Sequence, residues 1–315
     1  MSKMEYLKNL PVAVLGGGAV GKTCAADIKL AGREVRLYDV MPFAEKSLKD
    51  LDKTGILFDG IQRNRDCFER SGRAFIDVVT SDIEKAIKGA GHIVVSCGSW
   101  GHEAMFRAMI PYLEDGQVVN VFADNFGCLL LRRLMRELGC TKKVIVGGWS
   151  SAPYGTRLES IGKCVFPHVS AKYRAITLRG AALPMTDTDD FLEASKDLPC
   201  MDAVTNGDGP SKANTVLDVD FANVNPVIHV PATILGVSTM ENWGVIFGGH
   251  DKTTYSMYSH GLCPSICEVQ YQFYNEEIAL AEAIGVGTKK LPWPRQSAWV
   301  ALSTSMRCSS PAAAC

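Results

Sequence analysis

The stretch from Pro11 to Asp39 constrains the fold more than any other part of the chain, because a β-α-β unit fits it without a gap. Residues 12–15 form a continuous apolar run, which is typical of a parallel strand buried on both faces. A glycine-rich turn follows, and apolar residues then recur every four positions, as on one face of a helix, up to Gly32. The segment 34–39 alternates apolar and charged residues and indicates a second strand. The stretch therefore predicts the start of an α/β domain.

The alternation of strands and helices continues further along the chain. Apolar runs at 92–97, 117–122 and 143–148 are separated by segments with apolar residues at helical spacing. This alternation predicts a mainly parallel sheet covered on both faces. We therefore expect a doubly wound Rossmann-type α/β domain over residues 1–190. A smaller all-helical domain is expected over 191–315, where helical patterns replace strand patterns.

The glycine turn fits two different phosphate-binding motifs. Gly16, Gly18 and Gly21 form GxGxxG, the turn that brings a dinucleotide pyrophosphate to a helix N-terminus. Gly16 and Gly21, followed by Lys22 and Thr23, also form GxxxxGK[ST], the phosphate loop of nucleoside triphosphatases. One segment is thus compatible with two kinds of enzyme.

Acidic residues elsewhere distinguish the two motifs. A triphosphatase needs an aspartate after an apolar strand, and Asp124 is the candidate. A dinucleotide site needs an acidic residue at the end of the second strand, about 20 residues beyond the turn, to bond the adenosine ribose. Asp39 occupies that position, so we favour dinucleotide binding and keep a P-loop NTPase as a remote alternative. In the favoured interpretation Lys22 is a solvated helix residue or a weak pyrophosphate contact.

The predicted cofactor site consists of Gly16, Gly17, Gly18, Ala19, Val20, Gly21 and Asp39. The carboxylate of Asp39 would repel the 2′-phosphate of NADP, so NAD is the expected cofactor. Arg36 lies shortly before Asp39, which leaves NADP as the less favoured cofactor.

The overall composition favours small-molecule partners. The formal net charge is −1, which gives no global electrostatic footprint for nucleic acid or an anionic membrane. The N-terminal residues lack the apolar core of a signal peptide and no apolar run is long enough to span a membrane, so a cytoplasmic location is expected. The 11 cysteines are scattered without a CxxC pair and indicate neither a metal site nor a disulfide framework.

A second unusual stretch, residues 223–235, has the sequence NVNPVIHVPATIL. Its two prolines would break or kink a helix-like apolar segment and hold nearby side chains in a fixed direction. His229 lies between the prolines and is the candidate acid–base residue. From the residues alone, a hydrogen-bonded core histidine is the alternative interpretation.

Several segments together resemble one enzyme family. These are the 223–235 stretch, the LGGGAVG turn with the GREVRLYD strand, SAPYGTRL at 151–158, and YSHGLCPSICEVQYQFYNEEIALAEAIGVG at 258–287. They resemble the opine dehydrogenase family, of octopine and nopaline dehydrogenase type. The resemblance extends from about residue 10 to residue 287 and implies an all-helical second domain.

The resemblance also implies a reaction. Members of this family condense an α-keto acid with the amine of an amino acid, and NAD(P)H then reduces the imine; the reverse oxidation also occurs. His229 matches the family's catalytic histidine, whose imidazole can protonate or polarise the oxygen or nitrogen at the carbon that receives hydride. We expect the amino acid and the α-keto acid to bind in a cleft between the two domains.

Three other residues are weaker candidates for substrate contacts. His102 follows the strand at 92–97, where the carboxyl edge of the sheet would face the nicotinamide, and it fits an ordinary helix start equally well. Arg157 can anchor a carboxylate or pair with a structural acid. Asn225 belongs to the same segment as His229.

The C-terminal part departs from the family pattern. The family carries an Arg-Tyr-x-x-Glu-Asp segment beyond the helix that ends here near Gly287, and this sequence has none. In the family that segment supplies an aspartate that orients the histidine and an arginine that binds the substrate carboxylate. Asp218, Asp220 and Glu241 are the nearby carboxylates, and Arg295 is the nominee for the arginine. The alternative function is therefore a dinucleotide-binding protein with impaired or no catalysis because of a truncated C-terminus.

Overall fold

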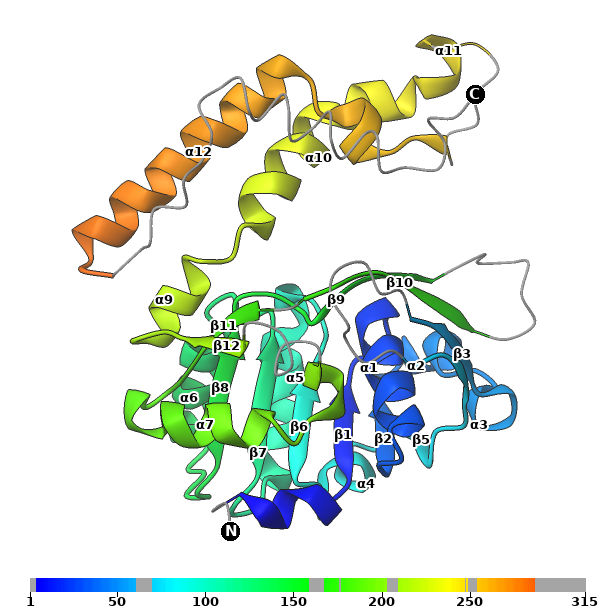
Figure 1. The fold of residues 1–315 in the computed structure, drawn as a ribbon, viewed down its shortest axis with the longest axis vertical. Helices are drawn as coiled ribbons and strands as arrows, with labels where there is room; N and C mark the ends of the chain where they lie inside the picture. Colours follow the sequence, from blue (N-terminus) through cyan, green and yellow to red (C-terminus); the bar gives the residue numbers. More distant parts are fainter. Residues whose placement is uncertain are drawn as a thin grey trace. The chain divides into compact units, whose positions relative to one another are not determined.

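The computed structural model describes residues 4–60, 70–158, 167–175, 177–202, 209–246, 248 and 254–286. Contacts divide the chain into two compact units, Met1–Asp220 and Phe221–Cys315 (Figure 1). The first unit combines strands with surrounding helices, and the described part of the second is helical.

An eight-stranded sheet forms the centre of the first unit, in the order β12-β11-β8-β7-β6-β1-β2-β5 (Figure 1). Six neighbouring strands, β5, β2, β1, β6, β7 and β8, are parallel to one another. Strand β11 runs antiparallel to β8. Their bounds are β1 Val12–Leu15, β2 Val35–Tyr38, β5 Val78–Thr80, β6 His92–Val95, β7 Val118–Phe122, β8 Ile145–Trp149, β11 Thr177–Ala182 and β12 Gly209–Lys212. The doubly wound Rossmann-type sheet predicted from the sequence is thereby confirmed.

Helices cover both faces of this sheet. Their bounds are η1 Glu5–Asn9, α1 Ala19–Leu30, α2 Ala44–Ser47, α3 Leu51–Thr54, α4 Ile83–Ile87, η2 Ser99–Gly101, α5 His102–Met109, η3 Ile110–Tyr112, α6 Gly127–Glu137, η4 Met185–Asp187, α7 Thr188–Ser195, η5 Pro199–Met201 and α9 Val216–Asp220. Val12 and Val14 of β1 pack in the core that contains α1 and α7 residues. Ala13 and Leu15 pack in the core that contains α4, α5 and α6 residues. Burial on both faces explains the continuous apolar run of this strand.

A smaller sheet packs on α1, in the order β4-β3-β10-β9. Its strands are β3 Ile56–Asp59, β4 Gly72–Ala74, β9 Tyr154–Leu158 and β10 His168–Arg174. It is anchored to the helix by Tyr154, whose hydroxyl donates a 2.5 Å hydrogen bond to the buried carboxylate of Asp27. Arg70 holds the other oxygen of this carboxylate, also at 2.5 Å. The second sheet therefore fixes the outer face of the helix that follows the glycine turn.

The two units divide after Asp220, beyond the sequence-based boundary at residue 190. Residues beyond the sequence-based boundary still pack on the main sheet, since Phe191 is buried against Trp149 and β12 pairs with β11. The sequence of β12, Gly209–Lys212, is GPSK, which has no apolar alternation that would indicate a strand. The difference between the two boundaries comes from this polar edge strand.

The second unit contains α10 Asn225–Glu241, α11 Trp243–Ile246, the π-helical turn η7 Met257–Gly261 and α12 Pro264–Ala283 (Figure 1). Helix α10 packs on α12, and the two share small clusters of buried apolar side chains. Helix α10 has Pro226 in its first turn and continues through Pro231, so of the expected break or kink, a break does not occur at Pro231. Within the described segments, no helix has the length and apolar character needed to cross a membrane.

Candidate functional site

The glycine turn lies at the carboxyl ends of three neighbouring strands. Gly16 follows β1, its N–H donates a 2.9 Å hydrogen bond to the Tyr38 carbonyl at the end of β2, and its Cα faces Ser96 after β6. Gly16 has φ +118°, where a side chain is strained, and a Cβ there would lie 3.0 Å from the Ser96 Oγ. Only glycine is compatible with this turn. In open α/β sheets, this edge is where ligands bind.

The other two glycines of the motif serve different purposes. A Cβ on Gly21 would lie 1.7 Å from the Gly16 carbonyl oxygen, so the helix can approach the turn only without a side chain there. Gly18 is the N-cap of α1, and a Cβ on it would meet no atom within 4 Å. Space is therefore open beside Gly18 at the N-terminus of α1, a helix whose first N–H groups have no partner inside the helix. This arrangement suits a pyrophosphate.

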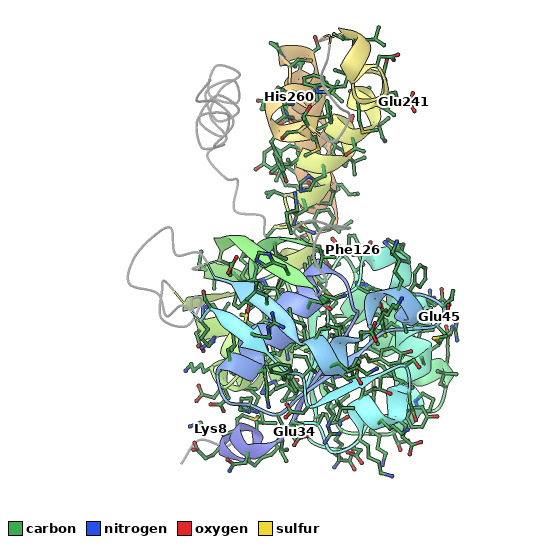
Figure 2. All side chains as sticks on the ribbon, turned by 90° about the vertical axis from the view of Figure 1, so that its right-hand side faces the viewer. Lys8, Glu34, Glu45, Phe126, Glu241 and His260 are labelled. Atoms are coloured by element: carbon green, nitrogen blue, oxygen red, sulfur yellow. The ribbon has the colours of Figure 1, made fainter. Side chains whose placement is uncertain are left out.

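Asp39 lies beside the turn, at the end of β2. Its Oδ1 accepts a 2.9 Å hydrogen bond from the Val40 N–H, and its Oδ2 accepts one of 2.5 Å from the Ser47 hydroxyl. A Cβ on Gly17 would lie 2.8 Å from the same Oδ2. Ser47 comes from α2, whose Glu45 is labelled in Figure 2. The predicted cofactor residues are thus brought together in one place, and Ser47, which sequence reasoning missed, fixes the carboxylate.

The geometry of Thr23 and Asp124 does not support a triphosphatase. The Thr23 hydroxyl donates a 2.8 Å hydrogen bond to the Ala19 carbonyl and lies 2.8 Å from the Thr156 hydroxyl, so its bonding is used within the fold. Asp124 is 1% exposed, and its Oδ1 accepts a 2.8 Å bond from the Cys128 N–H. Neither side chain is presented as a ligand for magnesium.

Lys22 differs from its sequence-based description. Instead of being solvated, the side chain is 3% exposed, and its ammonium donates a hydrogen bond to the Gly17 carbonyl oxygen. Burial lowers the pKa of Lys22 to about 8, although the nearby Asp39 carboxylate acts in the opposite direction. The expectation of a solvated residue is wrong, because the side chain is buried against the backbone of the glycine turn.

His102 begins α5 and is 1% exposed. Its ring packs against Phe106, and a Cβ on Gly127 would lie 2.9 Å from its Nδ1. Burial lowers the pKa of His102, which favours the neutral imidazole. The histidine lies near the predicted sheet edge, but it is covered by the start of α6.

Asp124, in the turn between β7 and α6, forms a buried pair with Asp220. Asp220 lies at the end of α9, and its Oδ1 accepts a 2.9 Å bond from the Phe126 N–H (Phe126 is labelled in Figure 2). The carboxyl groups of Asp124 and Asp220 interact, and the second oxygen of each is buried without another partner. Burial and the proximity of the two acids raise the pKa of Asp220 to about 8. Burial and the neighbouring carboxyl group therefore favour the protonated form of the pair.

The carboxylates nominated as partners of His229 lie in different settings. Asp218 accepts hydrogen bonds from the N–H and hydroxyl of Thr215, at 2.8 and 2.6 Å. Asp220 belongs to the buried pair of the first unit, and Glu241 is exposed at the end of α10 (Figure 2). Arg295 lies outside the described residues.

His229 lies in α10 of the second unit and contacts Tyr258. The Tyr258 hydroxyl is 3.4 Å from the His229 Nε2, and the rings meet edge to face with centroids 5.7 Å apart. Asn225 is the first residue of α10, on the same helix face as His229 because the two are four positions apart. The Asn225 amide donates a 2.6 Å hydrogen bond to the Asn223 side chain. Tyr258 is a candidate that sequence reasoning missed, although it belongs to the 258–287 segment.

Arg157 is an exposed residue of β9 in the first unit. Its guanidinium donates a 3.0 Å hydrogen bond to the Thr156 carbonyl. The structure thus places the site candidates in two groups, the cofactor residues in the first unit and the His229 group in the second.

Comparisons with known proteins point to one family. The family model described as the NAD/NADP octopine/nopaline dehydrogenase alpha-helical domain matches residues 212–297. A curated opine dehydrogenase from Arthrobacter sp. (strain 1C) is 28% identical over 289 residues, which covers 90% of this chain and 71% of that protein.

Solved structures share the fold. An octopine dehydrogenase with NADH and L-arginine has a TM-score of 0.61 at 20% identity, covering 92% of this chain and 67% of that one. A yersinopine dehydrogenase with NADP⁺ has a TM-score of 0.66 at 15% identity, with coverages of 96% and 75%. A PanE/ApbA family ketopantoate reductase from Ralstonia eutropha JMP134 has a TM-score of 0.59 at 19% identity, with coverages of 96% and 84%.

Proposed function

We propose that this chain is a member of the opine dehydrogenase family, an NAD(P)-dependent dehydrogenase that reduces the imine formed by an α-keto acid and an amino acid; the matched helical-domain model and the similarity to a curated opine dehydrogenase support this. The same enzyme would catalyse the reverse oxidation. The observation that carries the proposal is the turn in which Gly16 and Gly21 allow α1 to approach the end of β1, Gly18 leaves open space at the N-terminus of α1, and the Asp39 carboxylate lies beside Gly17. The cofactor, when bound, supplies the hydride.

NAD is the proposed cofactor, with NADP less favoured. The Asp39 carboxylate is fixed next to Gly17, where it can accept hydrogen bonds from ribose hydroxyls and would repel a 2′-phosphate. Arg36 makes a 3.0 Å ion pair with Glu34, and its guanidinium also donates to the Lys88 carbonyl. It is therefore engaged away from Asp39. Among the similar structures, octopine dehydrogenase carries NADH and yersinopine dehydrogenase carries NADP⁺.

His229 is proposed as the acid–base residue. Reduction of an imine adds hydride to carbon and a proton to nitrogen, and an imidazole that titrates near neutrality can move that proton. Tyr258 is the residue proposed to orient the ring, in place of the family's aspartate. The Gln270 amide donates a 2.7 Å bond to the Ile228 carbonyl, which fixes the backbone next to His229.

The substrates are proposed to be an amino acid and an α-keto acid. Octopine dehydrogenase has been solved with L-arginine, with pyruvate and with agmatine. Asn225 shares the helix face of His229 and is the proposed amide contact. Arg157 is exposed and is the proposed carboxylate anchor. For His102, burial favours a packing role over substrate contact.

One observation favours the second candidate function, a dinucleotide-binding protein with impaired catalysis. Asp218 and Asp220, two of the carboxylates nominated from the sequence as partners of His229, are both engaged within the first unit.

The test is to incubate the protein with NADH, an α-keto acid mixture and an amino acid mixture, and to search for N-(carboxyalkyl) amino acids by mass spectrometry. Product that is absent with His229→Asn supports the proposed dehydrogenase. Binding of NADH without product supports the second candidate, and absence of NADH binding contradicts both.

A further inference from the structure

Lys22 directly follows Gly21, the last glycine of the GxGxxG motif, and the dinucleotide motif gives it no role. It occupies the first turn of α1, where its own N–H donates a 3.0 Å hydrogen bond to the Gly18 carbonyl. Lysine is rarely buried without a partner, yet this side chain is 3% exposed. The ammonium donates to the Gly17 carbonyl oxygen, inside the turn itself.

The position of this charge is unfavourable without an anion. The N-terminus of a helix carries a partial positive charge, which disfavours a cation in the first turn. Burial adds a desolvation cost, and it lowers the pKa of Lys22 to about 8. The Asp39 carboxylate compensates in part, because it favours the charged form. A pyrophosphate bound at the open end of α1 would supply the remaining negative charge.

The contact with Gly17 also has a geometric consequence. The carbonyl of Gly17 and the N–H of Gly18 belong to one planar peptide, and in a trans peptide they point in opposite directions. The cis peptides among the described residues lie elsewhere, so this peptide is trans. Because the carbonyl is turned towards the buried ammonium, the Gly18 N–H is turned away from it. Gly18 is exposed and faces open space.

We infer that Lys22 is a positioning residue of the cofactor site, whose ammonium holds the Gly17 peptide so that the Gly18 N–H donates to the pyrophosphate of the dinucleotide. The inference rests on the proposed dinucleotide-binding function and adds to it a residue that acts through the turn. The positive charge of Lys22 would also attract the negatively charged cofactor directly.

The charge of Lys22 makes a pH-dependent readout available. Among the described residues, titratable groups near the turn include Tyr38 and Asp39 at the end of β2, Cys97 after β6, and His102, which interacts with the Cys97 backbone. Burial raises the pKa of Cys97 to about 11 and lowers that of His102, so neither changes charge between about pH 7 and about pH 9. The pKa of Lys22, about 8, lies within this interval, so the ammonium loses its proton as the pH rises. Loss of its proton removes a charge that favours an anionic ligand, so affinity falls as pH rises.

The experiment measures NADH binding by fluorescence titration at about pH 7 and about pH 9. The unaltered protein should bind more weakly at the higher pH, by roughly up to tenfold. Lys22→Met keeps the aliphatic stem and removes the ammonium; it should weaken binding at about pH 7 by about tenfold and abolish the pH dependence. Lys46→Met in the neighbouring α2 removes an exposed lysine and should change neither value.

Three results would overturn the inference. One is wild-type affinity in Lys22→Met at about pH 7, and another is weaker binding with an unchanged pH dependence, which indicates only a packing defect. If Lys22→Met does not fold, the unaltered protein still decides the matter, because pH-independent affinity contradicts a titrating lysine at the turn. Failure of the unaltered protein to bind NADH at either pH overturns the proposed function itself and is therefore distinguishable.

Discussion

Gly21 approaches Gly16 so closely that a Cβ on Gly21 would lie 1.7 Å from the Gly16 carbonyl oxygen. Gly21→Ala should therefore displace α1 from the turn, lower the free energy of unfolding by about 3 kcal/mol and abolish NADH binding. Gly18→Ala is the matched variant, since Gly18 has φ −74° and an open environment. It should unfold like the unaltered protein in urea yet bind NADH more weakly, because the pyrophosphate approaches this glycine. Equal stability of the two variants would contradict the assigned packing.

Asp39→Ala should change the preference between cofactors. Removal of the carboxylate removes both the acceptor for ribose hydroxyls and the charge that repels a 2′-phosphate. NADH affinity should fall by about tenfold, while NADPH affinity stays the same or rises. Binding titrations with both cofactors measure the ratio. The exposed Asp189, paired with Lys212 at 2.5 Å, provides the control Asp189→Ala, which should leave the ratio unchanged. An unchanged ratio in Asp39→Ala would remove this residue from the cofactor site.

Tyr258→Phe tests the contact with the proposed acid–base residue. The variant retains the ring that packs edge to face on His229 and removes only the hydroxyl at 3.4 Å. The rate of imine reduction should fall by about threefold to tenfold, with a shift in the pH profile, because the imidazole loses a hydrogen-bond partner. The Michaelis constant for NADH should not change. A loss of rate with an unaltered pH profile would show that the hydroxyl acts on packing rather than on the imidazole.

The Asp124–Asp220 pair predicts a dependence of stability on pH. Both pKa values are raised by burial, and that of Asp220 reaches about 8, so the folded state retains protons that the unfolded chain loses. The stabilising contribution is complete below the unfolded pKa of about 4 and is lost as pH rises through the folded value of about 8. Urea unfolding of the first unit should show this decline between about pH 5 and about pH 8.

Asp220→Asn is the direct test of the shared proton. Its amide keeps an oxygen for the Phe126 N–H and provides a permanent donor to Asp124. The decline with pH should become shallower, and the free energy of unfolding at about pH 8 should rise by about 1 kcal/mol relative to the unaltered protein. A variant that is less stable at every pH by the same amount would contradict proton sharing.

The sequence predicted the central sheet well because each of its strands carries its own signal. Buried parallel strands such as Val12–Leu15 appear as unbroken apolar runs, and the turn that follows needs glycine for steric reasons. The edge strand Gly209–Lys212 has no such signal, because its sequence GPSK lacks apolar residues and its side chains are partly or fully exposed. The domain boundary estimated from the sequence, at residue 190, therefore lies before this strand.

Side-chain contacts between distant segments were less predictable. The burial of Lys22 depends on how α1 meets the turn, and a lysine in a helix sequence ordinarily indicates a solvated position. The pairing of Asp124 with Asp220 depends on α9 returning to the β7–α6 turn, which no local pattern encodes. In the second unit, the prolines predicted a break or a kink, and Pro231 is accommodated within α10 without ending the helix.

The central claim is that this chain reduces imines with a nicotinamide cofactor, and the most direct test is the loss of NADH absorbance in the presence of an α-keto acid and an amino acid. We predict that NADH is consumed only when both substrates are present, and that His229→Asn abolishes consumption while NADH binding persists. NADH that is bound but never consumed with any pair from a broad set of substrates, or consumption that is unchanged in His229→Asn, would contradict the account.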